Sequence, residues 1–183
     1  MPDFPDDKDL VFQFKNGSQK DWVFTQIIQK YQEKLYALIR RIIISHDDTN
    51  DVLQNVFIKV WNNLNSFRED SQLFTWLYKI ATNESLNFLE KRKKNRYYSL
   101  IDDESDLINK IKADETFDGN KIEWKLQLAI QKLPEKQKIV FNLRYYEEMP
   151  YDEMSEILET SAGALKASYH HAVKKIEAYL TSQ

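Results

Sequence analysis

The chain has no cysteine, only three glycines and four prolines among 183 residues, and no long apolar run. Without cysteine, thiol catalysis, thiolate metal sites and disulfides are all excluded. The scarcity of helix breakers predicts an all-α protein. No segment approaches the roughly 20 apolar residues that cross a bilayer, and the acidic first residues do not resemble a secretory signal. We therefore expect a cytoplasmic protein without membrane insertion.

The formal net charge of -3 hides a segregation of charge along the chain. The run Lys91–Arg96 holds five cations and no acid, whereas carboxylates gather in residues 97–120. A cationic run attracts a polyanion through its local field, whatever the net charge of the chain. The charge pattern is therefore compatible with a nucleic-acid partner.

Apolar side chains at spacings of three and four predict the helices. A loop is expected at residues 65–72, and an acidic linker at 97–120 with a short helix near Leu107–Ile111. Side chains of residues 46–49 are expected to cap the second helix, and Pro134 to begin a later one. The predicted helices cover residues 21–45, 73–94, 122–130, 135–146, 151–159 and 162–180. A further helix follows the capping residues 46–49 and extends to Leu64.

The last two predicted helices flank a short turn at Thr160–Ser161, which is typical of a helix-turn-helix. Residues 147–159 contain six acids and no base. Residues 161–176 instead contain three lysines and two histidines and no acid. Only the second helix is therefore suited to a phosphate-lined groove.

Three runs of residues resemble the extracytoplasmic-function (ECF), or group IV, sigma factors of bacterial RNA polymerase, in the sigma-70 family. They are Asp51–Trp61, Phe74–Arg96 and Met149–Ile176, in that family's order and spacing. The resemblance implies a sigma-2-like helical bundle in residues 1–96 and a sigma-4-like helix-turn-helix domain in residues 121–183. Residues 97–120 would then be a flexible acidic linker that enters the nucleic-acid channels of the polymerase.

The resemblance also implies partners: core RNA polymerase, through the coiled coil of its largest subunit and its flap, and promoter DNA. It leaves open an anti-sigma factor as a further partner. The residues implied in polymerase binding lie on the second helix. They are Asp51, Gln54, Asn55, Phe57, Ile58 and Trp61.

Recognition and melting of the minus-ten promoter element are implied for the loop and the third helix. Aromatic faces replace lost base stacking, amides read exposed base edges, and the basic run grips phosphates. The implied residues are Phe67, Arg68, Ser71, Phe74, Trp76, Tyr78, Lys79, Asn83, Asn87, Lys91 and Arg92.

Reading of the minus-thirty-five element is implied for the last helix. Lysine and histidine donate to guanine edges or phosphates, and small side chains allow close approach to the bases. The chain departs from the family's usual residues at Pro150, Glu159, Ala164, Ser168 and His171, so promoter preference cannot be transferred from relatives. The implied residues are Ser161, Ala162, Ala164, Lys166, Ala167, Ser168, His170, His171 and Lys175.

Three other functions are weighed against a sigma factor. A structural or anti-sigma-like interaction module does not explain two separated cationic surfaces. An enzyme is disfavoured, because no catalytic constellation, metal-ligand spacing or phosphate-binding loop appears, and we expect neither a cofactor nor a metal. A helix-turn-helix regulator that acts without replacing sigma explains the C-terminal helices. It does not explain the aromatic, amide and basic helices within residues 20–96.

Overall fold

The computed structural model describes residues 4–96 and 121–181, in which all regular structure is helical. This confirms the predicted all-α class. The linker predicted at 97–120 lies outside the described residues, together with its short helix. The N-terminal half contains α1 (Asp7–Asn16), α2 (Lys20–Ile43), α3 (His46–Asn63), the 3-10 turn η1 (Leu64–Ser66) and α4 (Leu73–Arg96). The C-terminal half contains α6 (Lys121–Gln131), α7 (Glu135–Tyr145), α8 (Tyr151–Leu158) and α9 (Ala162–Thr181).

Helix beginnings differ from the sequence expectations in three places. Helix α1 was not expected; Asp6 caps it by accepting a hydrogen bond from the Lys8 amide at 2.8 Å. Helix α3 is capped by Ser45, whose hydroxyl accepts from the Asp48 amide, so residues 46–49 lie inside the helix rather than capping it. Pro134 is the N-cap of α7 and not its first residue. Two of these differences shift a boundary and one adds a helix, and none changes the helical class.

The core of the N-terminal half forms around α2, which packs against α1, α3 and α4. Its buried face has the predicted period, and Leu77 and Ala81 of α4 are fully buried. Tyr78, which the family resemblance implies in DNA contact, is also fully buried, and so is Thr82. The reason is that α4 packs against α8 as well as against α2 and α3, and so buries more than one face.

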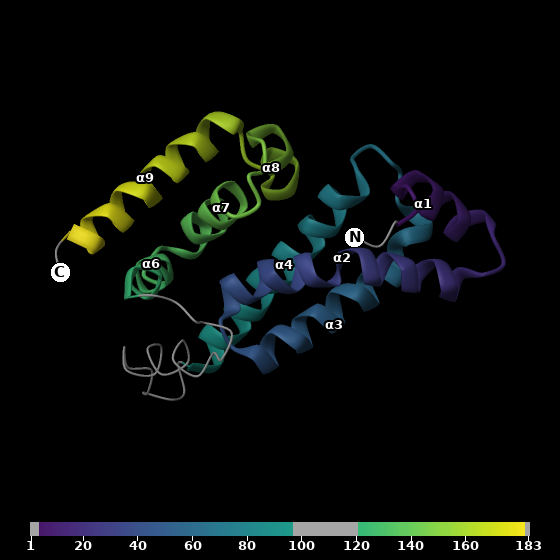
Figure 1. The fold of residues 1–183 in the computed structure, drawn as a ribbon, viewed down its shortest axis with the longest axis horizontal. Coiled ribbons are helices and arrows are strands. Elements are labelled where there is room, and N and C mark those ends of the chain that lie inside the picture. Colours follow the sequence, from purple (N-terminus) through teal and green to yellow (C-terminus); the bar gives the residue numbers. More distant parts are fainter. Residues whose placement is uncertain (1–3, 97–120, 182–183) are drawn as a thin grey trace.

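The two helical halves pack against each other through α8 on α4 and α7 on α2, and Figure 1 shows α8 beside α4. Residues of α7, α8 and α9 belong to the same continuous apolar core as those of α1 to α4. A smaller second cluster joins α6, α7 and α9. The contributions of the C-terminal half to the shared core are Ile139, Val140, Leu143, Met149, Met154, Ile157 and Leu165.

The shared core predicts the effect of Met154→Ala. Met154 is fully buried in α8, so its truncation should lower the free energy of unfolding by about 2 to 5 kcal/mol. Urea titration followed by circular dichroism measures this loss, and hydrogen exchange should show weaker protection in α4 as well as in α8. Glu177→Ala on the exposed side of α9 is the control, with an expected change within about 0.5 kcal/mol. Unaltered protection of α4 in Met154→Ala would contradict a shared core.

Candidate nucleic-acid interface

The outer face of α3 combines polar and large apolar side chains. Ile58 is 52% exposed and Trp61 is 37% exposed. The Trp61 ring is held edge-on by Phe14 and Phe24, at centroid distances of 5.3 and 5.0 Å. A rigid aromatic edge with polar surroundings is typical of a protein-binding surface. The other predicted docking residues lie here too: Asp51, Gln54 and Asn55 are exposed, and Phe57 is half-buried.

The loop of residues 67–72 joins η1 to α4 and carries the first predicted DNA contacts. Arg68 is exposed, whereas the Phe67 ring is buried against Trp76 at a centroid distance of 5.0 Å. The Phe67 ring therefore packs into the protein beneath the loop surface and is not exposed to solvent. Ser71, Phe74 and Trp76 are half-buried around it.

An open groove of about 590 Å³ lies between the beginning of α1, this loop and α8. From α8, Glu153 and Glu156 line it. The C-terminal half therefore places carboxylates beside the loop that is predicted to receive a DNA strand. The remaining lining residues are Asp6, Asp7, Lys8, Val11, Phe67, Glu69, Asp70, Ser71, Gln72, Leu73 and Thr75.

The middle of α4 is held by the C-terminal half. The Glu147 carboxylate accepts hydrogen bonds from the Tyr78 hydroxyl at 2.8 Å and from the Arg41 guanidinium at 2.6 Å. Burial and the neighbouring Glu147 charge raise the pKa of Tyr78. Lys79 forms an ion pair with Glu159 at 2.7 Å, which lowers the pKa of Glu159. In this arrangement Tyr78 is out of reach of DNA and Lys79 is engaged.

The end of α4 contacts α7 through charged groups. Lys93 forms an ion pair with Glu135 at 2.9 Å. Burial lowers the pKa of Lys138 to about 8, opposed by Glu135 and reinforced by the positive charges of Arg92 and Lys93. The Lys138 ammonium donates to Gln131 at 2.6 Å. Asn83, Asn87 and Lys91 remain exposed along this part of α4, and Arg92 is half-buried.

Helix α9 leaves one long face exposed. Ser161 accepts a hydrogen bond from the Ala164 amide at 3.3 Å and so stabilises the beginning of the helix. Glu159 ends α8 in the left-handed conformation, at φ 50°, which glycine commonly adopts. Lys174 is exposed at the same helical angle as Ala167 and His170 but was not among the predicted contacts. The predicted residues Ala164, Lys166, Ala167, His170, His171 and Lys175 are exposed, and Ala162 and Ser168 are half-buried.

Comparison with known proteins identifies the family of the chain. The family model for sigma-70 region 2 matches residues 27–95, and that for sigma-70 region 4 matches residues 123–176. The ECF RNA polymerase sigma-E factor of Haemophilus influenzae is 30% identical over 179 residues, and the match covers 93% of both chains. The chain is an ECF sigma factor.

Other relatives share its length and fold. The ECF sigma factor SigW of Bacillus subtilis is 28% identical, with 89% of this chain and 90% of the relative covered. The sigma factor RpoE of Bartonella quintana, solved with the anti-sigma factor NepR, has a TM-score of 0.72 at 21% identity and covers 86% of this chain and 96% of its own. CnrH, solved with the cytosolic domain of CnrY, has a TM-score of 0.70 at 22% identity and covers 97% and 98%.

As a member of this family, the sigma factor directs promoter-specific initiation of transcription. The predicted residues lie on three parts of the structure: α3, the loop with α4, and α9, with the rings of Phe67 and Tyr78 buried. The individual roles of these residues stay predictions. No helix in residues 4–96 or 121–181 is long and apolar enough to cross a bilayer. Sequence reasoning missed Lys15, Arg41 and Glu147, whose contacts join positions 52 to 106 residues apart.

Because Glu147 and Arg41 join the two halves, we expect loss of their ion pair to weaken the contact between the halves. Glu147→Gln removes the charge opposite a partly buried guanidinium, so the contact between the halves should weaken by about 1 to 3 kcal/mol. The chain lacks cysteine, so cysteines introduced at the exposed Asn62 and Glu177 can carry a fluorophore pair. Energy transfer between them should fall in Glu147→Gln.

The matched control is Glu148→Gln, which removes the same charge from the neighbouring, exposed side chain. Energy transfer should stay at the parent value in this control. Equal energy transfer in both variants would show that Glu147 does not hold the halves together.

The lowered pKa of Lys138 predicts a pH dependence of stability. The ammonium loses its proton near pH 8 in the folded protein but near 10.5 when unfolded. Between these values the unfolded state binds more protons, so the free energy of unfolding should rise with pH, by about 1 kcal/mol from pH 7 to pH 9. Urea titrations of the parent and of Lys138→Met measure this, because the variant should lack the rise. Parallel pH profiles for the two proteins would contradict the prediction.

Proposed function

We propose that this sigma factor binds core RNA polymerase through the outer face of α3 and then positions the enzyme at promoters. The observation that carries the proposal is the exposed edge of Trp61 and the exposed Ile58, beside Asp51 and Gln54 on one helix. The apolar groups supply buried area, and the polar groups fix orientation on a charged partner surface. The chain works in the cytoplasm and contributes no catalysis itself, since RNA synthesis belongs to the polymerase.

The two DNA surfaces divide promoter recognition between them. The loop of residues 67–72 and the outer face of α4 hold the unpaired minus-ten strand, with Arg68, Asn83 and Asn87 exposed for it. Helix α9 enters the major groove of the minus-thirty-five element with the face that contains Lys166, Ala167 and His170. The linker of residues 97–120 connects these two surfaces within the polymerase.

The closed packing of the halves suits a resting form of the free chain. Tyr78 and Lys79 on α4 are engaged by Glu147 and Glu159, while the outer face of α3 stays open to a partner. Figure 1 shows α3 on the side of the N-terminal half away from α7, α8 and α9. Docking on polymerase therefore precedes separation of the halves, and separation precedes strand binding. The free chain is a weak promoter binder for the same reason.

An anti-sigma factor is a natural regulator of such a protein. The similar structures of RpoE and CnrH are complexes with NepR and with the cytosolic domain of CnrY. Such a partner of the present chain would cover α3 or stabilise one arrangement of the two halves. Either action would prevent engagement of the polymerase without any change in the DNA-reading helix.

Run-off transcription tests the function directly. Core RNA polymerase with the purified chain should initiate on a subset of genomic fragments, and sequencing of the transcripts defines the promoter. Asp51→Arg should lower the affinity for core polymerase by about tenfold, because it reverses a charge on the docking face. Fluorescence anisotropy of labelled chain titrated with core polymerase measures this loss.

The control for Asp51→Arg is Glu33→Arg, the same reversal at an exposed position of α2. It should bind polymerase like the parent. Equal affinities for parent and Asp51→Arg would remove α3 from the docking surface. No initiation on any fragment, combined with binding of palindromic DNA by the chain alone, would instead identify a regulator that acts without replacing sigma.

A further inference from the structure

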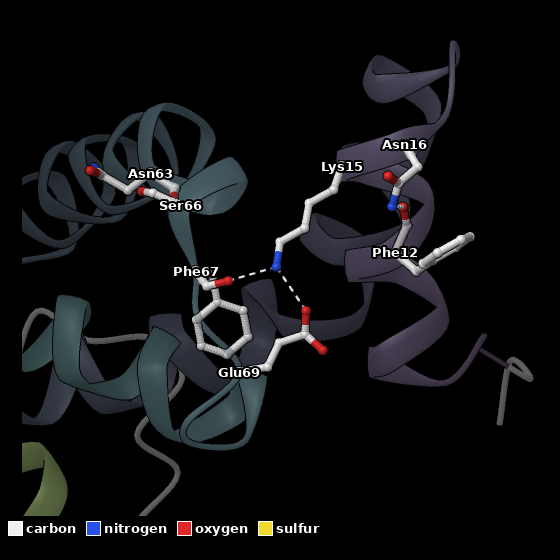
Figure 2. Close-up of polar contacts among 7 residues, drawn as sticks. All are labelled: Phe12, Lys15, Asn16, Asn63, Ser66, Phe67 and Glu69. Carbon is white, nitrogen blue, oxygen red and sulfur yellow. Dashed lines mark hydrogen bonds and ion pairs between the residues drawn. The ribbon is translucent and has the colours of Figure 1, made fainter.

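The loop of residues 67–72 is held by a lysine from a distant helix. The Lys15 ammonium of α1 donates to the Phe67 carbonyl oxygen at 2.6 Å and to the Glu69 carboxylate at 2.7 Å. It also lies 5.9 Å from the centre of the Phe67 ring. Figure 2 shows both hydrogen bonds and the loop between them. One cation thus fixes a backbone group and a side chain of the same short loop.

The conformation of the loop requires such support. Glu69 has a φ of 61°, in the left-handed region, which costs a non-glycine residue about 1 kcal/mol or more. The Phe67 ring is buried against Trp76, so the first residue of the loop is anchored from below. Lys15 holds the Phe67 carbonyl and the Glu69 side chain, which stand on either side of Arg68. Between these fixed points Arg68 remains exposed and free to face a ligand.

We propose that Lys15 is a positioning residue that holds loop 67–72 in the shape that accepts an unstacked base of single-stranded promoter DNA. The proposal rests on the proposed function, in which this loop receives the minus-ten strand. A loop fixed before binding loses less conformational entropy when the base enters, so the affinity for the correct base increases. Lys15 lies outside residues 27–95, the segment matched by the family model, and belongs to the helix that the sequence patterns did not predict.

The charge of Lys15 has a second effect that the test must separate from positioning. The loop borders a groove with many carboxylates, among them Glu69, Asp70 and Asp7. Removal of the ammonium leaves Glu69 unpaired and adds repulsion toward DNA phosphates. Repulsion weakens binding of every strand equally. Loss of loop shape instead weakens discrimination between bases at one position.

The experiment measures base discrimination by the assembled holoenzyme. Fluorescence anisotropy is recorded with single-stranded oligonucleotides of the minus-ten element defined by run-off mapping, with each base replaced in turn. Lys15→Met keeps the apolar stem and removes the ammonium. We expect its discrimination at one position to fall about tenfold, within the range that a single base contact supplies. Hydrogen exchange of residues 68–72 in the free chain should become faster in the same variant.

Three further variants separate the causes. Lys15→Arg keeps a cation with several donors and should retain discrimination. The double variant Lys15→Met with Glu69→Gln removes the repulsion but not the loss of loop shape, so it should stay defective. Lys34→Met removes the same charge from an exposed lysine of α2 and should behave like the parent. Affinity for core polymerase should be unchanged in all of them.

Several outcomes would overturn the proposal. Parent-like discrimination in Lys15→Met would do so, as would full recovery in the double variant, because recovery leaves repulsion as the only effect. Loss of polymerase affinity together with a lower unfolding temperature would assign Lys15 to general stability. Failure of the parent chain itself to initiate would count against the proposed function instead, and the hydrogen-exchange comparison would still test the positioning of the loop.

Discussion

The carboxylate of Glu147 sets the relation between the two halves of this sigma factor. It follows α7, and the turn that presents it is closed by the Met149 amide, which donates to the Leu143 carbonyl at 3.1 Å. The Glu147 carboxylate accepts hydrogen bonds from Arg41, at the end of α2, and from Tyr78, in the middle of α4. The guanidinium of Arg41 in turn lies over the Tyr146 ring at 4.3 Å. The path of the chain into α8, and with it the packing of α8 on α4, depends on this cluster.

The region around Glu147 contains buried polar groups as well as apolar ones. Asn142 of α7 is fully buried, and neither the nitrogen nor the oxygen of its side-chain amide has a hydrogen-bond partner among the described residues. An unsatisfied buried amide costs about 1 to 3 kcal/mol. Contacts between domains that separate are more polar than obligate ones. The polar groups are therefore compatible with the proposed separation of the halves, while Met154 and Ile157 supply apolar contact in the closed arrangement.

The helical class and most helix ranges could be predicted from the sequence because they depend on local periodicity and breakers. The pattern of α2 and the turn before α9 are of this kind. Burial of Tyr78 could not be predicted, since it depends on a partner 69 residues away. Helix α1 was not predicted, because its apolar pattern is short and only Leu10, Val11 and Phe14 form its buried face. The runs that resemble the family predicted three functional surfaces, and the roles of their residues stay predictions. The residues that hold these surfaces in place could not be predicted, because their contacts join distant parts of the chain.

The acidic side chains of the C-terminal half and a DNA strand would compete for the same surface, formed by loop 67–72 and Lys79. In the closed arrangement α8 turns Glu153 and Glu156 toward the loop, and Glu159 pairs with Lys79. The charge of these carboxylates has the same sign as that of DNA phosphates, so a strand that approached the loop or Lys79 in this arrangement would meet repulsion. They lie on a solvent-accessible surface, so their attraction to lysine is screened and weak. A DNA strand presents a denser line of charge than these separate acids. If polymerase separates the halves, as proposed above, we therefore expect promoter DNA to displace the weak internal contacts.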